Sequence, residues 1–404
     1  MEELVIKSEN EVDKVFAELE DIALFNQEKV LNAFKKARIA LNHFSCSNGY
    51  GYDDLGKNKL SEVFKYIFNA EEAICSPYIT CGTHALNAGL FGCLKTGDSI
   101  LSITGDVYDS LKNAVSGNGN GSLRDYGISF EKIELLPNGK INFDEVSNYL
   151  KTHNPTMIYL QRSCGYSNRD TFSINELKQA IDFVKNLVPN VITFVDNCYG
   201  TFSEKQEPTD VGADMVVGSL MKNAGGGIAP SGGYIVGRKD LVDRTAGRLF
   251  GVGLGMEVGS YACSYQNYFQ GVFIAPTVVM GALKGSTLLG QTLKNLGIES
   301  FPKAGTKPND LIRRIVFNDE KKMIDFIKVV QANSPVDSFV VPYPSDMPGY
   351  DDKIIMASGG FVQGSSVEMS ADGPVRPPYT AYFQGGLTYE HVKIFVNEVV
   401  KVLK

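Results

Sequence analysis

The sequence predicts an α/β fold with a mostly parallel central sheet and a smaller α+β domain at the C-terminus. First, short apolar runs alternate with segments of helical periodicity between residues 73 and 237, and repeated βα units form parallel sheets covered by helices on both faces. Second, polar residues such as Asp196 and Lys222 follow these runs, at the strand ends where such sheets bind ligands. Third, the pattern changes after residue 285 to a long helical stretch.

The individual elements follow from local patterns. Apolar residues at helical spacing from Val12 to Phe34 predict one or two helices between residues 9 and 40. The glycine- and tyrosine-rich stretch 43–57 predicts an irregular segment exposed to a site or a subunit contact. Apolar runs predict central strands at 73–76, 99–103, 132–136, 157–160, 191–195, 215–217 and 233–236. Helices are predicted between them at 83–94, 143–151, 174–188 and in a short stretch after residue 209.

The last third of the chain is predicted to form the smaller domain. A helical stretch runs from 285 to 296, followed by segments at 314–318 and 321–331 and a C-terminal helix at 389–403. We therefore expect an N-terminal helical segment at 1–45, a large α/β domain at 46–284 that binds the ligand, and a small α+β domain at 285–404.

Composition argues against several classes of function. The 404 residues are 43% hydrophobic and 21% charged, with a net charge of −7, so neither nucleic acid nor an anionic membrane is an expected partner. The acidic N-terminus lacks an apolar core of signal-peptide length, and no run approaches roughly 18 apolar residues, so a soluble cytoplasmic protein is expected. Seven cysteines without a C-x-x-C pair and only four histidines predict reduced thiols and no metal site.

Lys222 and Asp196 give the strongest chemical signal. Lys222 follows the apolar run 215–217 and precedes a glycine run, a setting that suits an amine forming a Schiff base with an aldehyde cofactor. Asp196 closes the run 191–195, where a carboxylate suits the partner of a protonated pyridine nitrogen. Together they indicate pyridoxal phosphate. A lysine in this setting, taken alone, would more often be a surface charge. A phosphate-loop motif is excluded, because the lysine precedes the glycines.

Neighbouring residues suit the remaining parts of this cofactor. Gly82 and Thr83 open a predicted helix, whose N–H groups and dipole favour a phosphate, although Thr83 equally suits a plain helix cap. Ser219 adds a hydroxyl to the same phosphate. Tyr108 follows a strand and suits stacking on the ring and proton transfer. Ordinary packing is the alternative for Tyr108, and His84 competes for the stacking position.

Arg376 is a candidate for substrate binding. It lies in a stiff segment bounded by Pro374 and Pro377, and the planar guanidinium of arginine matches the α-carboxylate of an amino acid. A surface arginine held between prolines is an equally good interpretation of this segment taken alone.

These residues resemble a known group of proteins. The order and setting of Gly82-Thr83, Tyr108, Asp196-Asn197 and Ser219-x-x-Lys222 are similar to fold-type I pyridoxal phosphate enzymes of cysteine and methionine metabolism. More closely, the chain resembles the bacterial aluminium resistance proteins, a cystathionine β-lyase-like or methionine γ-lyase-like group. The runs that carry this resemblance span nearly the whole chain: Tyr50-Gly51-Tyr52-Asp53-Asp54, Gly82-Thr83-His84-Ala85, Gly218-Ser219-x-x-Lys222-Asn223, Gly225-Gly226-Gly227, Tyr265-Gln266-x-x-Phe269-Gln270-Gly271, Asp372 to Pro378 and Gln384-Gly385-Gly386-Leu387-Thr388.

The resemblance implies the fold-type I transferase fold and a role for each candidate residue. It implies a Schiff base at Lys222, a ring-nitrogen partner at Asp196 and ring stacking by Tyr108. Phosphate contacts are implied for Gly82, Thr83 and Ser219, and Tyr52 resembles a tyrosine that reaches the phosphate of a neighbouring subunit, which implies a homodimer or homotetramer with a shared site.

The chain also departs from the family pattern. Lys57 stands about where an arginine reaches the neighbouring subunit's phosphate, Met221 replaces a hydroxyl residue and Cys81 replaces a serine. These departures weaken any transfer of substrate specificity.

The function expected from this resemblance is β- or γ-elimination on a sulfur-containing amino acid. An aminotransferase or aldolase-type reaction remains the first alternative, because the same cofactor residues serve all of them. A non-catalytic stress-resistance protein that keeps the fold is the second.

Overall fold

The seven-stranded sheet at the centre of the molecule has the order β1-β7-β6-β5-β4-β2-β3. The structure is a computed structural model that describes residues 2–119, 121–347 and 352–404. Only β7 runs antiparallel to the rest of this sheet, which confirms the mostly parallel sheet. Its strands are β1 (Glu72–Ser76), β2 (Ser99–Ser102), β3 (Ser129–Lys132), β4 (Met157–Gln161), β5 (Ile192–Asp196), β6 (Met215–Ser219) and β7 (Gly233–Gly237).

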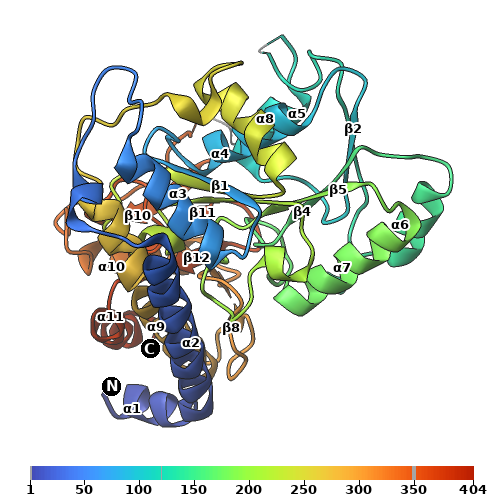
Figure 1. The fold of residues 1–404 in the computed structure, drawn as a ribbon. Coiled ribbons are helices and arrows are strands. Elements are labelled where there is room, and N and C mark those ends of the chain that lie inside the picture. The colour runs from blue at the N-terminus through green and yellow to red at the C-terminus, as the bar shows by residue number, and fades with distance from the viewer. Residues whose placement is uncertain (1, 120, 348–351) are drawn as a thin grey trace.

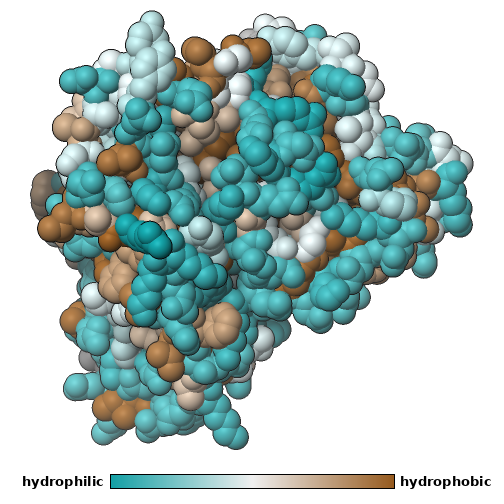
Figure 2. Space-filling model, in the orientation of Figure 1, coloured by the Kyte–Doolittle hydropathy of each residue, from teal (hydrophilic) through white to brown (hydrophobic). Residues whose placement is uncertain are grey.

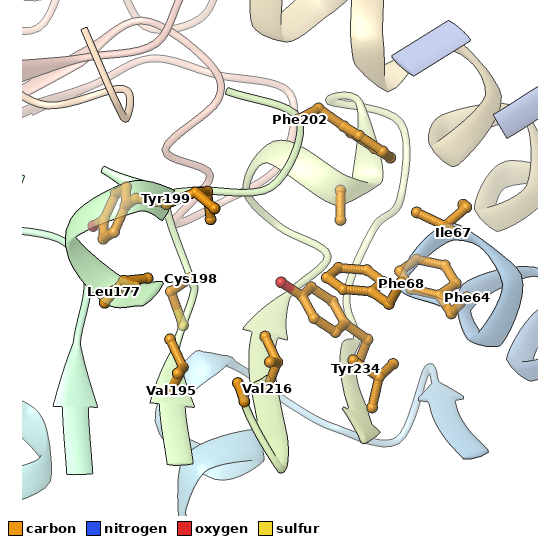
Figure 3. Close-up of a cluster of buried hydrophobic side chains, with 14 of the residues drawn as sticks. Phe64, Ile67, Phe68, Leu177, Val195, Cys198, Tyr199, Phe202, Val216 and Tyr234 are labelled. Carbon is orange, nitrogen blue, oxygen red and sulfur yellow. The ribbon is translucent and has the colours of Figure 1, made fainter. Parts of the chain in front are cut away.

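Helices cover this sheet (Figure 1). They are α3 (Leu55–Ile67), α4 (Gly82–Cys93), α5 (Asp109–Ser116), α6 (Phe143–Leu150), α7 (Ile174–Leu187) and α8 (Lys239–Phe250). The side chains of β4 to β7 are buried throughout, as expected for strands that helices cover on both faces. The close-up in Figure 3 shows part of this core, where Phe64 of α3 and Phe68, directly after this helix, pack against Tyr234 of β7.

The second sheet lies in the C-terminal part and is antiparallel, with the order β10-β11-β12-β9-β8. The helices and strands of this C-terminal part are α9 (Gln266–Asn295), β8 (Glu299–Phe301), β9 (Arg313–Val316), α10 (Glu320–Ala332), β10 (Ile354–Ser358), β11 (Ser370–Pro374), β12 (Thr380–Gln384) and α11 (Tyr389–Leu403). The N-terminal helices α1 (Glu2–Asn10) and α2 (Asp13–Ala37) pack along α9. The first and last helices of the described residues, α1 and α11, contact each other. The domain division stays a prediction, and its boundary at residue 285 falls inside α9.

The helix α9 has the length and apolar composition of a membrane-spanning helix but lies in the core of this fold. Among the helices of the described residues, only α9 is long and apolar enough to cross a membrane by length and composition, and 72% of its most apolar window is buried inside the protein. It contacts α2 and α11, as a core helix does. Figure 2 shows hydrophilic residues over most of one face of the molecule, with apolar residues scattered among them.

The predicted strand at 132–136 is wrong. The strand is β3, three residues earlier, and it pairs only with β2 at the edge of the sheet. Its side chains are mostly exposed, whereas Ile133, just after it, is buried. Because β3 lies at the edge of the sheet, its residues are less apolar than those of the loop that follows it. The apolar run therefore pointed to the loop and not to the strand. The helices α3, α5 and α8 were not predicted either.

Candidate active site

Three neighbouring strands bring the main candidate residues together. Gln161 at the end of β4 pairs with Asp196 at the end of β5, and Lys222 follows the end of β6 by three residues. These strand ends open into a cavity of about 150 Å³. The residues around it are Cys81, Gly82, Thr83, Leu86, Tyr108, Gln161, Ser163, Asp196, Cys198, Tyr199, Ser219, Met221, Lys222 and Gly364.

The Lys222 amine contacts Tyr199, which follows β5, and Ser366, which precedes β11. Its Nζ donates a hydrogen bond to Ser366 Oγ over 3.1 Å and lies 3.7 Å from the centre of the Tyr199 ring. Burial favours the neutral amine, but the Tyr199 phenol, the Cys198 thiol and the Asp196 carboxylate favour the ammonium more strongly, so the pKa of Lys222 is raised.

The Asp196 carboxylate, which favours the ammonium form of Lys222, has two hydrogen-bond donors of its own. Its Oδ1 accepts a hydrogen bond from the backbone N–H of Cys198 over 3.0 Å, and its Oδ2 accepts one from the Tyr159 hydroxyl over 3.4 Å. Burial raises the pKa of Asp196, and the Cys198 hydrogen bond and the positive charge of Lys222 oppose that shift. A cationic group beside this carboxylate would therefore stabilise its ionised form.

The N-terminus of α4 forms another wall of the cavity. Cys81 caps the helix, with its Sγ accepting a hydrogen bond from the His84 N–H. A Cβ at Gly82 would lie 2.9 Å from Cys198 Sγ, so only glycine leaves this wall open. The Thr83 hydroxyl contacts Ser110 Oγ over 2.7 Å. Free backbone N–H groups at a helix start are suited to a phosphate.

Tyr108 and His84 differ in position. Tyr108 lines the cavity, whereas the His84 ring nitrogen Nδ1 accepts a hydrogen bond from the Thr80 backbone over 3.1 Å and the side chain does not line it. Tyr108 is therefore the better placed of the two proposed stacking residues. Ser219 also lines the cavity, and its Oγ accepts a hydrogen bond from the Met221 N–H.

The glycine run after Lys222 serves packing. A Cβ at Gly226 would lie 2.3 Å from the Gly271 carbonyl of α9, and one at Gly227 would lie 2.3 Å from the Leu387 side chain. Both glycines also have positive φ angles. The run lets the lysine loop lie directly against α9 and the C-terminal part.

Arg376 lies beside a second cavity of about 280 Å³, which shares Tyr108 and Gln161 with the first. Its Nη1 pairs with Asp352 Oδ2 over 2.7 Å, and 53% of the side chain is exposed. The arginine is thus placed at the rim, next to the proposed stacking tyrosine.

Tyr52 does not line the first cavity of its own chain. Its side chain is 64% exposed, and its ring stacks on Tyr50 at 5.3 Å between centres. Lys57 is buried, and its Nζ donates hydrogen bonds to the Met256 and Val258 carbonyls over 2.6 and 2.9 Å. Lys57 therefore fixes a loop of its own chain.

Sequence reasoning assigned no role to four residues near Lys222. Gln161, Tyr199, Ser366 and Asp372 were missed. The Gln161 Oε1 is buried and has no hydrogen-bond partner among the described residues. A signal was available for Asp372, because the run from Asp372 to Pro378 carries part of the family resemblance.

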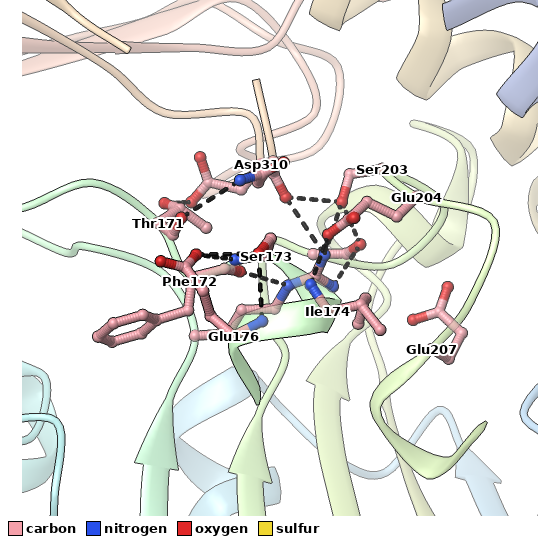
Figure 4. A network of polar contacts seen from close by, with 12 residues as sticks. Thr171, Phe172, Ser173, Ile174, Glu176, Ser203, Glu204, Glu207 and Asp310 are labelled. Atoms are coloured by element: carbon pink, nitrogen blue, oxygen red, sulfur yellow. Dashed lines mark hydrogen bonds and ion pairs between the residues drawn. The ribbon is translucent and has the colours of Figure 1, made fainter. Parts of the chain in front are cut away.

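A buried arginine supports the loops at the strand ends. Arg162, directly after β4, is 1% exposed. It donates hydrogen bonds to Asn197 Oδ1 over 2.9 Å, to the Gly200 carbonyl over 3.0 Å and to Glu204 Oε1 over 2.8 Å. Figure 4 shows this polar network, in which Glu204 also accepts the N–H of Ile174 at the start of α7. The network ties Asn197, next to Asp196, to the loop that follows it.

The cavity fits one type of cofactor. The Lys222 amine and the buried Asp196 carboxylate line this cavity close to the ends of neighbouring strands. The N-terminus of α4, which begins with Gly82, and the Tyr108 ring line it as well. These groups match an aldehyde, a basic ring nitrogen, a phosphate and a planar ring, all of which pyridoxal phosphate carries.

Comparisons with known proteins found similarity along the whole chain. The family model for methionine gamma-lyase matches residues 1–404. The chain is 44% identical to the uncharacterised protein YnbB of Bacillus subtilis, over 100% of this chain and 96% of that one. A crystal structure from Listeria monocytogenes, assigned as a cystathionine beta-lyase involved in aluminum resistance, is 44% identical with a TM-score of 0.97 and 100% coverage of both chains.

A more distant structure shows the fold alone. The pyridoxal-5'-phosphate-dependent protein YhfS of Escherichia coli is 15% identical, with a TM-score of 0.65 over 95% of this chain and 97% of that one. The predicted fold-type I architecture is confirmed.

Proposed function

The chain belongs to the methionine gamma-lyase family, and from that premise we propose that it is a pyridoxal phosphate-dependent carbon–sulfur lyase acting on a sulfur-containing amino acid. The observation that carries this proposal is that Lys222 and Asp196 line the same cavity, Asp196 at the end of β5 and Lys222 just after the neighbouring strand β6. Family membership supports the cofactor, and the cavity supplies a partner for each of its functional groups.

The proposed reaction is an elimination. For a β-substituted substrate, the C–S bond breaks, the α-proton is removed, and addition of water gives a free thiol, ammonium and pyruvate. When bound, pyridoxal phosphate would link the amino group through its aldehyde and draw electrons from the α-carbon. A γ-substituted substrate would release the thiol with a longer keto acid.

The residues of the chain have separate roles in this proposal. Lys222 Nζ takes the α-proton in its neutral form, which burial favours, and Ser366 and Tyr199 hold that amine in place. Asp196 keeps the ring nitrogen protonated. Tyr108 stacks on the ring, and Tyr108 or Lys222 returns a proton to the departing sulfur.

The remaining contacts are proposed in the same way. Gly82, Thr83 and Ser219 bind the phosphate, and Arg376 at the neighbouring cavity binds the α-carboxylate. Tyr52 reaches the phosphate of a second subunit, so the protein is proposed to be a homodimer or homotetramer. A cytoplasmic location fits a small-molecule enzyme with reduced cysteines.

The test is the Lys222→Ala variant. We expect it to lose the visible absorbance of the covalently held cofactor and to lose thiol and keto acid release, by a factor on the order of 10³ or more. Lys239→Ala, which removes an exposed lysine of α8, is the matched control and should keep both. If Lys222→Ala kept normal turnover, the proposal would fail. Loss of the amino group to an added keto acid, without thiol release, would instead indicate a transferase.

A further inference from the structure

The small sheet presents a carboxylate towards the proposed active site. On β11, Ala371 is fully buried in the core under α10, and a Cβ at Gly373 would lie 2.5 Å from Ile327 of α10. Because successive side chains of a strand point to opposite faces, Asp372 between them points away from α10. Its neighbour on β12 in the register is Tyr382, which also alternates with core residues.

Tyr166, in the loop after β4, meets Asp372 on that face. The Tyr166 hydroxyl donates a hydrogen bond to Asp372 Oδ2 over 3.0 Å, and the Tyr382 hydroxyl donates one to the Tyr166 carbonyl over 2.9 Å. Tyr166 itself lines the second cavity together with Tyr108 and Arg376, and its ring centre lies 6.0 Å from that of Tyr108. Asp372 itself lines neither cavity, but its hydrogen-bond partner Tyr166 forms part of the wall of the second one.

The Asp372 carboxylate has few hydrogen-bond donors and no direct cationic partner among the described residues. Among the described residues, its carboxylate accepts one side-chain hydrogen bond, from Tyr166. The nearby Arg376 is paired with Asp352 instead. Lys222 is close enough to act on Asp372 electrostatically, but Lys222 is the residue proposed to bind the cofactor. Asp372 is not fully buried, and a ligand in the second cavity would reach it past Tyr166; a largely enclosed carboxylate with one partner gains from a second, positively charged donor.

We propose that Asp372, oriented by Tyr166, recognises a protonated amine on the leaving thiol of the substrate. The inference rests on the proposed lyase function and narrows its substrate class to thioether amino acids whose departing group is cationic near the sulfur. A methylthio group offers no hydrogen-bond donor to this carboxylate, and a thiol bearing only a carboxylate is repelled by it.

The test compares two substrates of nearly equal size. S-(2-aminoethyl)cysteine and S-propylcysteine differ by an ammonium in place of a methyl group at the end of the leaving thiol. For the holoenzyme we expect kcat/KM to favour the aminoethyl substrate by about tenfold to a hundredfold, the range of a hydrogen bond to a charged group. The difference should lie mainly in KM, because the contact exists before the C–S bond breaks.

Variants separate recognition from a structural role. Asp372→Asn should bring the ratio of the two kcat/KM values close to one while sparing S-propylcysteine, and Tyr166→Phe should lower the ratio partly. Glu299→Gln, which removes an exposed carboxylate from β8 of the same sheet, should leave the ratio unchanged. Equal kcat/KM values in the wild type, or an equal loss on both substrates in Asp372→Asn and Tyr166→Phe, would overturn the inference alone. Absence of thiol release from every thioether would overturn the lyase proposal as well.

Discussion

Burial controls the charge of two carboxylates that interact electrostatically with Lys222. Asp196 and Asp372 both have raised pKa values because protein surrounds them, and in both cases Lys222 opposes the shift. Asp196 has two donors, Cys198 and Tyr159, whereas Asp372 has Tyr166. The two carboxylates therefore differ in how strongly the protein itself stabilises their negative charge, and Asp372 depends more on a ligand.

This difference predicts a pH effect on substrate choice. Burial raises the pKa of Asp372 to about 6, against the hydrogen bond from Tyr166 and the charge of Lys222; the other titratable group beside it in the sheet is Tyr382. The recognising form is the carboxylate, so the preference for S-(2-aminoethyl)cysteine should be complete at about pH 8 and disappear as the pH falls through about 6, while the amine of the substrate stays protonated.

The measurement is the ratio of kcat/KM values for the two thioethers against pH. Because the Tyr166 hydrogen bond lowers the pKa of Asp372, Tyr166→Phe should move the midpoint to higher pH. A ratio independent of pH between about 5 and 8 would contradict this prediction.

Which site residues the sequence predicted depends on how local their signal is. Asp196, Ser219 and Lys222 each stand at or just after an apolar strand, so a few neighbouring residues were enough to place them. Ser366 contacts Lys222 from more than 140 residues away in sequence, and Asp372 and Lys222 interact electrostatically. No local pattern encodes that contact, and it had to come from the structure.

At the scale of elements, the start of α4 is the most constrained part of the proposed phosphate site. Gly82→Ala would place a Cβ 2.9 Å from Cys198 Sγ and 3.5 Å from Ser219 Cβ. We expect a destabilisation of about 1–3 kcal/mol from this overpacking and at least tenfold weaker cofactor binding, measured by absorbance titration. Cys198→Ala removes the closest contact, so the double variant should recover much of both losses. Additive losses in the double variant would show that the crowding argument is wrong.

The strand ends also depend on Arg162, which joins β4 to the loop after β5. Arg162→Met should lower the free energy of unfolding by about 3 kcal/mol, because it leaves Glu204 and several carbonyls without their buried donor. Denaturant unfolding would measure this. Adding Glu204→Gln removes the unpaired charge, so the double variant should be less destabilised than the sum of both changes. A fully additive result would mean that the ion pair has no role in the network.

Elements were predicted where burial is strong and local. The apolar runs of β4 to β7 were found because helices cover both faces of these strands. The segment at 314–318 overlaps β9, but the other strands of the second sheet were missed. A sequence such as Ser370-Ala371-Asp372-Gly373-Pro374 has low strand propensity and becomes a strand only through its pairing with β10 and β12.

At the scale of the whole molecule, the exposed tyrosine loop is the main reason to expect a shared site. Tyr50 and Tyr52 stack on each other at the surface. The loop that carries them is fixed, because the Gly259 N–H donates to the Tyr50 carbonyl over 3.1 Å and Ser260 Oγ donates to the Gly49 carbonyl over 2.8 Å. A fixed pair of exposed aromatic rings is suited to contact with a second protein surface.

A mixing experiment tests whether that surface belongs to a second copy of the chain. If Tyr52 completes the neighbouring subunit's site, Lys222→Ala and Tyr52→Ala should each be impaired alone, but a dimer containing one of each has one intact site, with Lys222 from one subunit and Tyr52 from the other. Random reassembly of equal amounts makes half of the dimers mixed, so activity should recover to about a quarter of the wild-type value. Light scattering should show the same oligomer throughout. No recovery after demonstrated subunit exchange would place Tyr52 outside the site of the partner, and a monomer with full activity would exclude a shared site altogether.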